Sequence, residues 1–245
     1  MSIAHILPIF LAIFIISTIY ASVGQAGASG FIAIMVLFDL AATTIKPTAL
    51  ILNVLVSLVV MWQFRRAGFL SWKKLWPFAI TSMPSAFIGG YVTLASNLFN
   101  GVLGSLLVIA SISLLLRRPQ PEQATVAPSV PWVLLTGGVI GLLSGLTGMG
   151  GGILLAPMLI YCRWYDTRTI AGISGAFIFL NSIVALLGLF WAGQSLPMHW
   201  GLYALAAVSG GFIGAQLGSR SIPVPIIHRL LGAILLLGGL KLMFI

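Results

Sequence analysis

Long apolar runs follow one another along almost the whole chain, and no other feature constrains the fold as strongly. Of the 245 residues, 60% are hydrophobic and only 6% are charged, whereas a soluble domain carries about 25% charged residues. A helix needs about 20 apolar residues to cross the hydrocarbon core of a bilayer. The pattern therefore predicts an all-α polytopic membrane protein and excludes a soluble enzyme.

Polar residues, glycine and proline interrupt the apolar sequence and divide the chain into segments. We place them at residues 5–23, 30–38, 47–64, 75–95, 100–116, 131–146, 151–162, 169–190, 199–217 and 224–244. A polar stretch, RRPQPEQATVAPSVP, begins at Arg117 and separates the fifth segment from the sixth. It divides the chain into a first transmembrane repeat (1–116), a linker (117–130) and a second transmembrane repeat (131–245). The segments predict eight to ten transmembrane helices, some of them short.

The two halves share patterns that recur in the same order. SAFIGG at Ser85 matches GGFIGA at Gly210, and GQAGASG at Gly24 matches GLTGMGGG at Gly145. Asn53 matches Asn181 in the same series. Such self-similarity predicts a structural duplication, as found in many transporters.

The placement of charge predicts the orientation of the chain. The formal net charge is +9, and five segments per half place most basic residues on one face. These residues are Arg65, Arg66, Lys73, Lys74, Arg117, Arg118, Arg163, Arg168, Arg220 and Arg229. Positive residues mark the cytoplasmic side, so the linker is expected there and both termini outside. Because each half has an odd number of segments, the second repeat is expected to be inverted relative to the first. The orientation rule explains the positive charge, so no nucleic-acid partner is expected.

The few carboxylates are expected at the surface. Asp39 is expected to pair with Lys46 at the outer face, and Asp166 with Arg163 and Arg168 at the cytoplasmic face. No carboxylate falls in the middle of a predicted segment, where a proton relay or a sodium site would need one.

Two predicted segments, 30–38 and 151–162, are too short to span the bilayer. A helix of about ten residues, at 1.5 Å each, covers only about half of a 30 Å core. Each segment follows a glycine cluster, and irregular backbone survives at this depth only where it is buried or lines a wet cavity. Free N–H groups and the positive helix end would face that cavity. Two inverted copies therefore predict an anion site at mid-membrane.

Close helix packing is a second interpretation of the glycines. It explains the stripes with four-residue spacing, Gly137, Gly141 and Gly145, and Gly210, Gly214 and Gly218. Three adjacent glycines at 150–152 define no single helix face and weaken a helix, which favours a binding role for them. For Asn53 and Asn181, hydrogen bonding between helices remains an equal alternative to substrate binding.

We combine the glycine clusters with nearby uncharged polar side chains, which can donate to an oxyanion. The expected substrate-binding residues are Gly24, Gln25, Gly27, Ser29, Gly30, Asn53, Thr147, Gly148, Gly150, Gly151, Gly152 and Asn181. The lone Cys162 and the absence of clustered His/Cys or nucleophile motifs from the sequence predict no metal site, no cofactor and no catalytic residues.

The run GLLSGLTGMGGGILLAPMLIY, with its partner VGQAGASGFIAIMVLF, resembles the TauE/SafE sulfite-exporter family of membrane permeases. The resemblance covers essentially the whole chain. Its motif residues here are Gly148, Gly150, Gly151, Gly152 and Pro157, with Gly24, Gly27 and Gly30 as an imperfect copy. The family implies transport of a sulfur-containing oxyanion, such as sulfite, thiosulfate or an organosulfonate, across the prokaryotic plasma membrane.

We therefore expect a multi-pass permease, not an enzyme, whose partners are a small anion and the lipid bilayer. Export is the expected direction, because an inside-negative membrane potential drives a monoanion outward without a coupling ion. Two alternatives stay open: a passive anion channel on the same scaffold, and a membrane assembly or accessory protein with no substrate of its own. The sequence does not indicate an oligomeric state.

Overall fold

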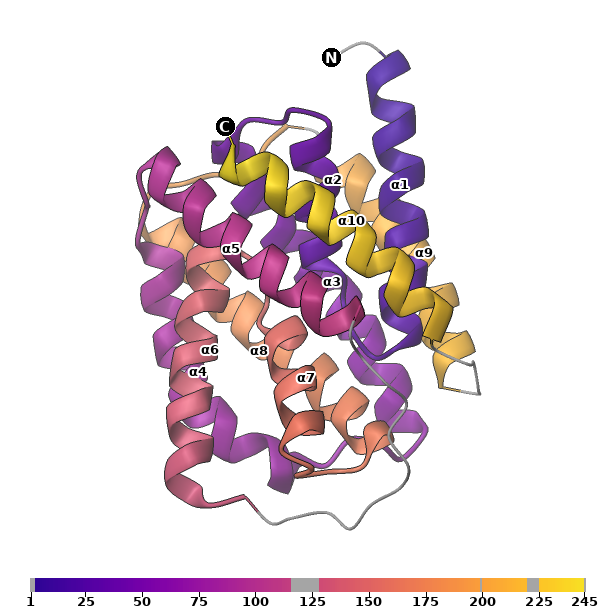
Figure 1. Ribbon diagram of the computed structural model, residues 1–245, viewed down its shortest axis with the longest axis vertical. Helices are drawn as coiled ribbons and strands as arrows, with labels where there is room; N and C mark the ends of the chain where they lie inside the picture. Colours follow the sequence, from indigo (N-terminus) through magenta and orange to yellow (C-terminus); the bar gives the residue numbers. More distant parts are fainter. Residues whose placement is uncertain (1–2, 116–127, 199, 220–224, 245) are drawn as a thin grey trace.

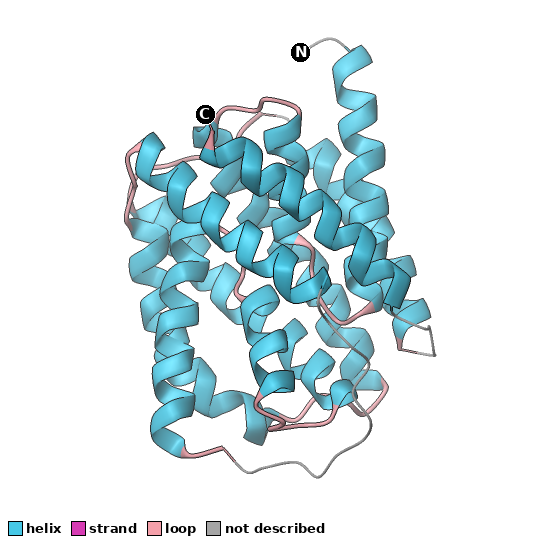
Figure 2. Cartoon of the chain, in the orientation of Figure 1, coloured by secondary structure: helices cyan, strands magenta, loops and turns pink. Residues whose placement is uncertain are grey.

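The computed structural model describes residues 3–115, 128–198, 200–219 and 225–244, and these residues form ten helices and no strand (Figures 1 and 2). The helices are α1 Ile3–Ser22, α2 Ala28–Leu37, α3 Ala42–Arg66, α4 Trp72–Tyr91, α5 Ser96–Leu115, α6 Val130–Thr147, α7 Gly152–Tyr161, α8 Thr167–Trp191, α9 Trp200–Gly218 and α10 Pro225–Met243. The all-α prediction is confirmed, and each predicted segment corresponds to one helix. Linker residues 117–127, with Arg117, Arg118 and Arg220, lie outside the described residues.

The surface of the bundle matches a membrane environment. Five helices of the described part are long and apolar enough to cross a bilayer: α3, α5, α6, α8 and α9. Large apolar side chains such as Leu11, Ile80 and Leu205 are exposed on the outside of the bundle, where lipid would cover them. Exposed Trp72 and Trp191 lie at helix ends, as expected for the membrane–water interfaces.

The helices of the two halves correspond in length and in packing. Helices α2 and α7 have 10 residues each, and α3 and α8 have 25 each. Helix α1 packs on α9 as α6 packs on α4, while α3 packs on α8 and α5 on α10. In Figure 1, α1 descends from the upper end of the bundle and α6 ascends from the lower end. These features are those that an inverted repeat predicts, and the duplication itself remains a prediction.

The two glycine stripes bring helix backbones into contact, as predicted. A Cβ atom at Gly141 of α6 would overlap the carbonyl oxygen of Ser82 in α4. A Cβ atom at Gly214 of α9 would overlap the carbonyl oxygen of Thr18 in α1. Only a residue without a side chain permits this approach, so the stripes serve packing.

Most of the described cations flank the α3–α4 and α7–α8 connections, which lie at the lower end of the bundle in Figure 1. There the α3–α4 and α7–α8 connections meet: Lys74 Nζ lies 4.9 Å from the Tyr165 ring, and Arg168 Cζ lies 5.3 Å from the Phe69 ring. This grouping agrees with the predicted cytoplasmic face, although the orientation in the membrane stays a prediction.

Both expected carboxylate pairings are wrong. Asp39 pairs with Lys241 of α10 at 2.7 Å, because Lys46 is buried and directed into the bundle. Asp166 accepts a hydrogen bond from the backbone N–H of Thr169 at 2.9 Å and so forms the N-cap of α8. A short side chain just before a helix meets the free N–H groups of the first turn more readily than it meets a flexible arginine.

Asp166 gives a pH-dependent prediction. Partial burial raises the pKa of Asp166, but hydrogen bonds from Thr169 and the charge of Lys74 outweigh burial and leave the pKa below its ordinary value. The ionised cap therefore stabilises the fold at neutral pH, and its contribution is lost as pH falls through the lowered pKa. We expect Asp166→Ala to lower the free energy of unfolding by about 1 kcal/mol at pH 7. Denaturant titration in detergent should show this difference shrinking below about pH 4. An equal difference at every pH would contradict the assignment.

Candidate functional site

Two breaks in the helices form the centre of the site. The backbone leaves helical geometry at residues 23–27 and 148–151. Positive φ angles occur at Gly24, Gly27, Gly148, Gly150 and Gly151, between 71° and 97°. L-residues with a side chain rarely adopt this conformation. Both predicted interruptions of the backbone are therefore confirmed, together with the short helices that follow them.

The two loops occupy corresponding places against the long central helices. Gly24 stands four residues before α2 and lies against Ala171, the fifth residue of α8. Gly148 stands four residues before α7 and lies against Lys46, the fifth residue of α3. Each glycine loop therefore contacts the long helix of the other half.

The second loop is packed closely around polar side chains. A Cβ atom at Gly150 would overlap the side-chain nitrogen of Asn53 and lie 3.0 Å from Ser182 Oγ. Asn53 Nδ2 in turn donates a hydrogen bond to Ser182 Oγ at 3.2 Å, which joins α3 to α8. The structure thus brings together Gly150, Asn53 and Ser182, whose sequence separations run from about 30 to 130 residues.

Several buried polar atoms near the loops have no hydrogen-bond partner among the described residues. They include Asn53 Oδ1, Ser144 Oγ and Ser174 Oγ beside the second loop; Asn181 Oδ1 in α8 also lacks a partner. Ser144 lies beside Gly151, and the backbone of Ser174 lies beside Gly152. The serine hydroxyls can donate, whereas the unpaired asparagine atoms are amide oxygens, which only accept. Buried polar groups without partners mark a ligand or water site.

The first N–H groups of the short helices add further donors. The first helical hydrogen bonds run from Phe31 N to Gly27 O in α2 and from Leu154 N to Gly151 O in α7. N–H groups at the start of a helix have no partner within it and carry a partial positive charge. The N-caps of both short helices are glycines without a side-chain cap.

Other predicted residues have local partners. Ser29 Oγ and Tyr20 OH lie 2.9 Å apart, and a Cβ at Gly30 would meet Tyr20 and Ile16 of α1. Thr147 Oγ1 donates to Leu143 O at 2.6 Å within α6. Asn181 Nδ2 donates to Phe177 O at 2.9 Å within α8. Gln25 is buried in the first loop. Among the described residues, no hydrogen bond joins these side chains to the Asn53 cluster.

A cavity of about 440 Å³ opens beside the second loop. The residues around it come from the start of α3, the α4–α5 connection, α5, α6 and the connection after α8. They are Thr43, Lys46, Thr93, Leu94, Ser96, Phe99, Leu146, Gly193, Gln194 and Ser195. The segments that line the cavity, the start of α3 and the connections after α4 and α8, lie at the upper end of the bundle in Figure 1, opposite the α3–α4 and α7–α8 connections. The cavity reaches Lys46 and Leu146, next to Gly148, but residues 148–152 do not line it.

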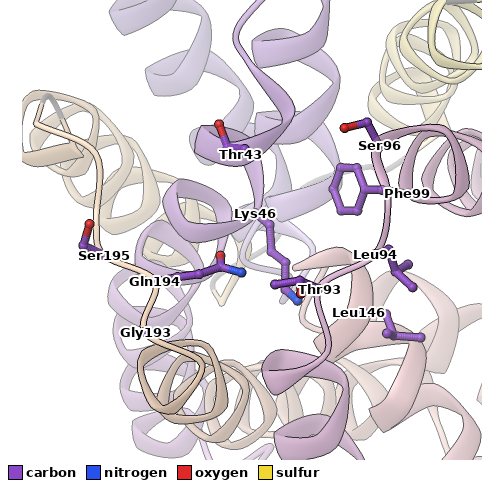
Figure 3. A pocket seen from close by; sticks show the side chains of 10 residues that line it. All are labelled: Thr43, Lys46, Thr93, Leu94, Ser96, Phe99, Leu146, Gly193, Gln194 and Ser195. Atoms are coloured by element: carbon purple, nitrogen blue, oxygen red, sulfur yellow. The ribbon is translucent and has the colours of Figure 1, made fainter.

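Lys46 is the residue of this region that the sequence analysis missed. Its exposed fraction is 6%, and Nζ donates to Gly89 O, Gly90 O and Val92 O at 3.0, 3.1 and 3.0 Å. Figure 3 shows its side chain extending toward Thr93, with the Gln194 amide on one side and Phe99 on the other. The sequence signal that could have identified Lys46 is an ionisable residue next to an apolar run, because an ionisable residue in a membrane segment indicates a functional role.

The interrupted helices, the buried polar loops and the lipid-facing exterior define a class, the polytopic membrane transporters. The chain belongs to the TauE/SafE family, since the family model described as "Sulfite exporter TauE/SafE" matches residues 9–242. It is thus a multi-pass membrane permease that moves a small substrate.

Curated relatives carry matching descriptions. The chain is 39% identical over 241 residues to the "Probable membrane transporter protein y4hK" of Sinorhizobium fredii (strain NBRC 101917 / NGR234), covering 96% of each chain. It is 29% identical over 192 residues to the "Probable membrane transporter protein YunE" of Bacillus subtilis (strain 168), covering 68% of each. To YjnA of the same organism, also described as a probable membrane transporter protein, it is 26% identical over 237 residues, covering 89% and 92%. No solved structure matches the chain.

Proposed function

We propose that the protein is an exporter of a small sulfur-containing oxyanion, such as sulfite, thiosulfate or an organosulfonate. The observation that carries this proposal is the second glycine loop, packed against Asn53, with the unpaired hydroxyls of Ser144 and Ser174 and the free N–H groups at the start of α7 beside it. The donors there are N–H and O–H groups, which suit an acceptor-rich anion.

The absence of a fixed charge on the loop favours release as well as binding. Amide and hydroxyl donors hold an oxyanion in a dry site without the strong attraction of a buried cation. The family description, a sulfite exporter, supports sulfur oxyanions as the substrate class. The residues we assign to the site are those of the two glycine loops, with Asn53, Asn181, Gln25, Ser29 and Thr147. We add Ser144, Ser174 and Ser182, which lie beside the second loop.

The packing at the two ends supports alternating access. The cavity beside Gly148 opens at one end, while at the other end Gly24 is packed against Ala171 and Gly172 against the Phe69 carbonyl. The substrate site would then be reached from the upper end in this state, and relative movement of the two halves would expose it at the lower end.

Purified protein in proteoliposomes tests the function. The internal solutes are sulfite, thiosulfate, isethionate and sulfoacetate as anions and taurine as a zwitterion, each loaded separately. We expect saturable efflux of at least one of the sulfur oxyanions, faster with a negative interior, since 100 mV contributes about 2.3 kcal/mol per charge. Protein-free liposomes are the control. If a thermal unfolding transition shows that the protein is folded and none of the five compounds leaves the liposomes, the proposal is refuted.

Two variants of this assay separate the alternatives. Counter-flow, the uptake of labelled anion driven by an opposite gradient of unlabelled anion, requires a carrier. If counter-flow is absent and the flux does not saturate, the protein is a channel. An accessory protein should lose complex formation but show no change of anion flux when Asn53 or Asn181 is replaced by leucine. A carrier with the proposed site should instead lose flux.

A further inference from the structure

We propose that Lys46 and the cavity it lines form a second anion-binding site, which receives the substrate at the upper end of the bundle beside the second glycine loop. This inference rests on the proposed function, because it assigns the same small oxyanion to a further site. It concerns a residue and a cavity that none of the glycine motifs includes.

The first argument is electrostatic. Lys46 is a buried ammonium group, and its three partners are neutral carbonyl oxygens rather than a carboxylate. Among the described residues, the one pairing of a lysine with an acidic residue joins Lys241 to Asp39. A buried ammonium group without a counter-ion is costly unless an opposite charge joins it. An anion in the cavity would supply the missing charge.

The second argument is the chemistry of the cavity. Lys46 extends toward Thr93 and the Gln194 amide lies to one side of it (Figure 3), so a cation, a hydroxyl-bearing residue and an amide line the same cavity. Gln194 follows α8 and Thr93 follows α4, so their side chains are carried by connections rather than by the packed bundle. The volume, about 440 Å³, lies within the usual range for small-molecule sites.

The carbonyl partners of Lys46 leave room for an anion. Gly89 and Gly90 belong to the last turn of α4, whereas Val92 follows the helix in extended geometry. An ammonium group has three donors. Lys46 Nζ can therefore exchange its hydrogen bond to Val92 O for one to an anion without disturbing the end of α4.

The third argument is position. The backbone of Lys46 lies against Gly148, so the cavity ends next to the second loop. The corresponding residue of the other half is Ala171, which lies against Gly24. A residue needed only to hold a glycine loop would not require a charge, as Ala171 shows. The ammonium group therefore has a role beyond packing.

Sided flux measurements test the proposal. The single cysteine, Cys162, lies at the lower end, so its reaction with an impermeant thiol reagent reports the orientation in proteoliposomes. With sulfite applied at the upper end, we expect Lys46→Met to raise the half-saturating concentration by about tenfold or more. Lys46→Arg should restore much of the affinity. Lys73→Met, which removes an exposed charge at the lower end, is the matched control and should equal the wild type.

Further variants separate binding from folding. Lys46→Met also leaves the carbonyls at the end of α4 unpaired and can lower stability. The double variant Thr93→Val/Gln194→Leu avoids this effect, because it keeps Lys46 and its three hydrogen bonds and removes only the neutral donors. It too should raise the half-saturating concentration for sulfite at the upper end, while the adjacent-turn control Thr44→Val should not. Wild-type affinity in both Lys46→Met and the double variant would overturn the proposal. If Lys46→Met does not fold, the double variant decides alone.

A reactivity measurement works even if no transport is detected. Ser195→Cys, made with Cys162→Ser, places a thiol in the cavity. At each position we compare the reaction rate of a methanethiosulfonate reagent that carries a sulfonate group with the rate of one that carries a trimethylammonium group. We expect the ratio of the first rate to the second to be about tenfold higher for Ser195→Cys than for the exposed control Met198→Cys. Lys46→Met should abolish the excess. Equal ratios at both positions would overturn the proposal, whereas failure of flux with an intact ratio would refute only the proposed function.

Discussion

Replacing Gly150 by alanine should lower anion flux by about 100-fold per folded molecule. A methyl group there would overlap the side-chain nitrogen of Asn53 and lie 2.8 Å from Ile178 Cγ2, so the loop or α3 must move. Displacement of a binding group by about 1 Å can cost about 100-fold in rate. The measurement is initial efflux of sulfite from proteoliposomes, scaled to the amount of folded protein.

The control for this variant must separate steric overlap from backbone strain. Gly68 has the same kind of backbone conformation, with φ of +80°, but no heavy atom lies within 4 Å of the added Cβ. Gly68→Ala therefore carries the strain of a left-handed alanine, about 1–2 kcal/mol, without the contact at Asn53. Flux per folded molecule should equal the wild type. If both variants lose flux equally, the second loop is not the site that limits transport.

Replacing Gly141 by alanine should lower the free energy of unfolding by about 3 kcal/mol. The added methyl group would overlap the carbonyl oxygen of Ser82 and lie 2.6 Å from its Cα. Backbone atoms cannot rotate away as a side chain does, so α4 and α6 must separate along their whole contact. The measurement is denaturant-induced unfolding in detergent, followed by tryptophan fluorescence.

The neighbouring residue on the same helix provides the matched control. Gly138 also faces α4, but the nearest atoms to its added Cβ, Ser85 Oγ at 3.7 Å and Thr81 Cβ at 3.8 Å, are at ordinary van der Waals distance. Gly138→Ala should change stability by less than about 0.5 kcal/mol. Gly214→Ala, at the corresponding α1–α9 contact, should resemble Gly141→Ala. Equal stability of the Gly141 and Gly138 variants would contradict the close packing of α4 and α6.

The helices and their order could be predicted because each apolar run is a local feature. The least accurate boundary was the start of α3, which was predicted at residue 47 but lies at Ala42. Pro47 suggested a helix start, since proline suits the first turn. It lies instead within the helix, where it removes the hydrogen bond to the carbonyl of Thr43. This difference of five residues placed Lys46 at the surface in the prediction and inside α3 in the structure.

The correspondence of Asn53 and Asn181 shows a second limit. The sequence pattern predicts that they are equivalent, but Asn53 is the twelfth residue of α3 and Asn181 the fifteenth of α8. The two helices have equal lengths, so the asparagines lie about one turn apart in corresponding positions. Asn53 therefore meets Ser182 and Gly150, while the amide of Asn181 bonds its own helix.

The sequence by itself determined the helical membrane fold, the breaks at the glycine clusters and the stripes that pack helices, because hydropathy and glycine conformation act over a few residues. Only the tertiary structure decided which polar groups lack partners and which charge meets which acceptor. Lys46 binds carbonyls more than 40 residues away, and Asp39 pairs with a lysine about 200 residues away. Burial and pairing depend on how α3, α4, α8 and α10 cross in space, and that crossing is set by the sum of all their contacts.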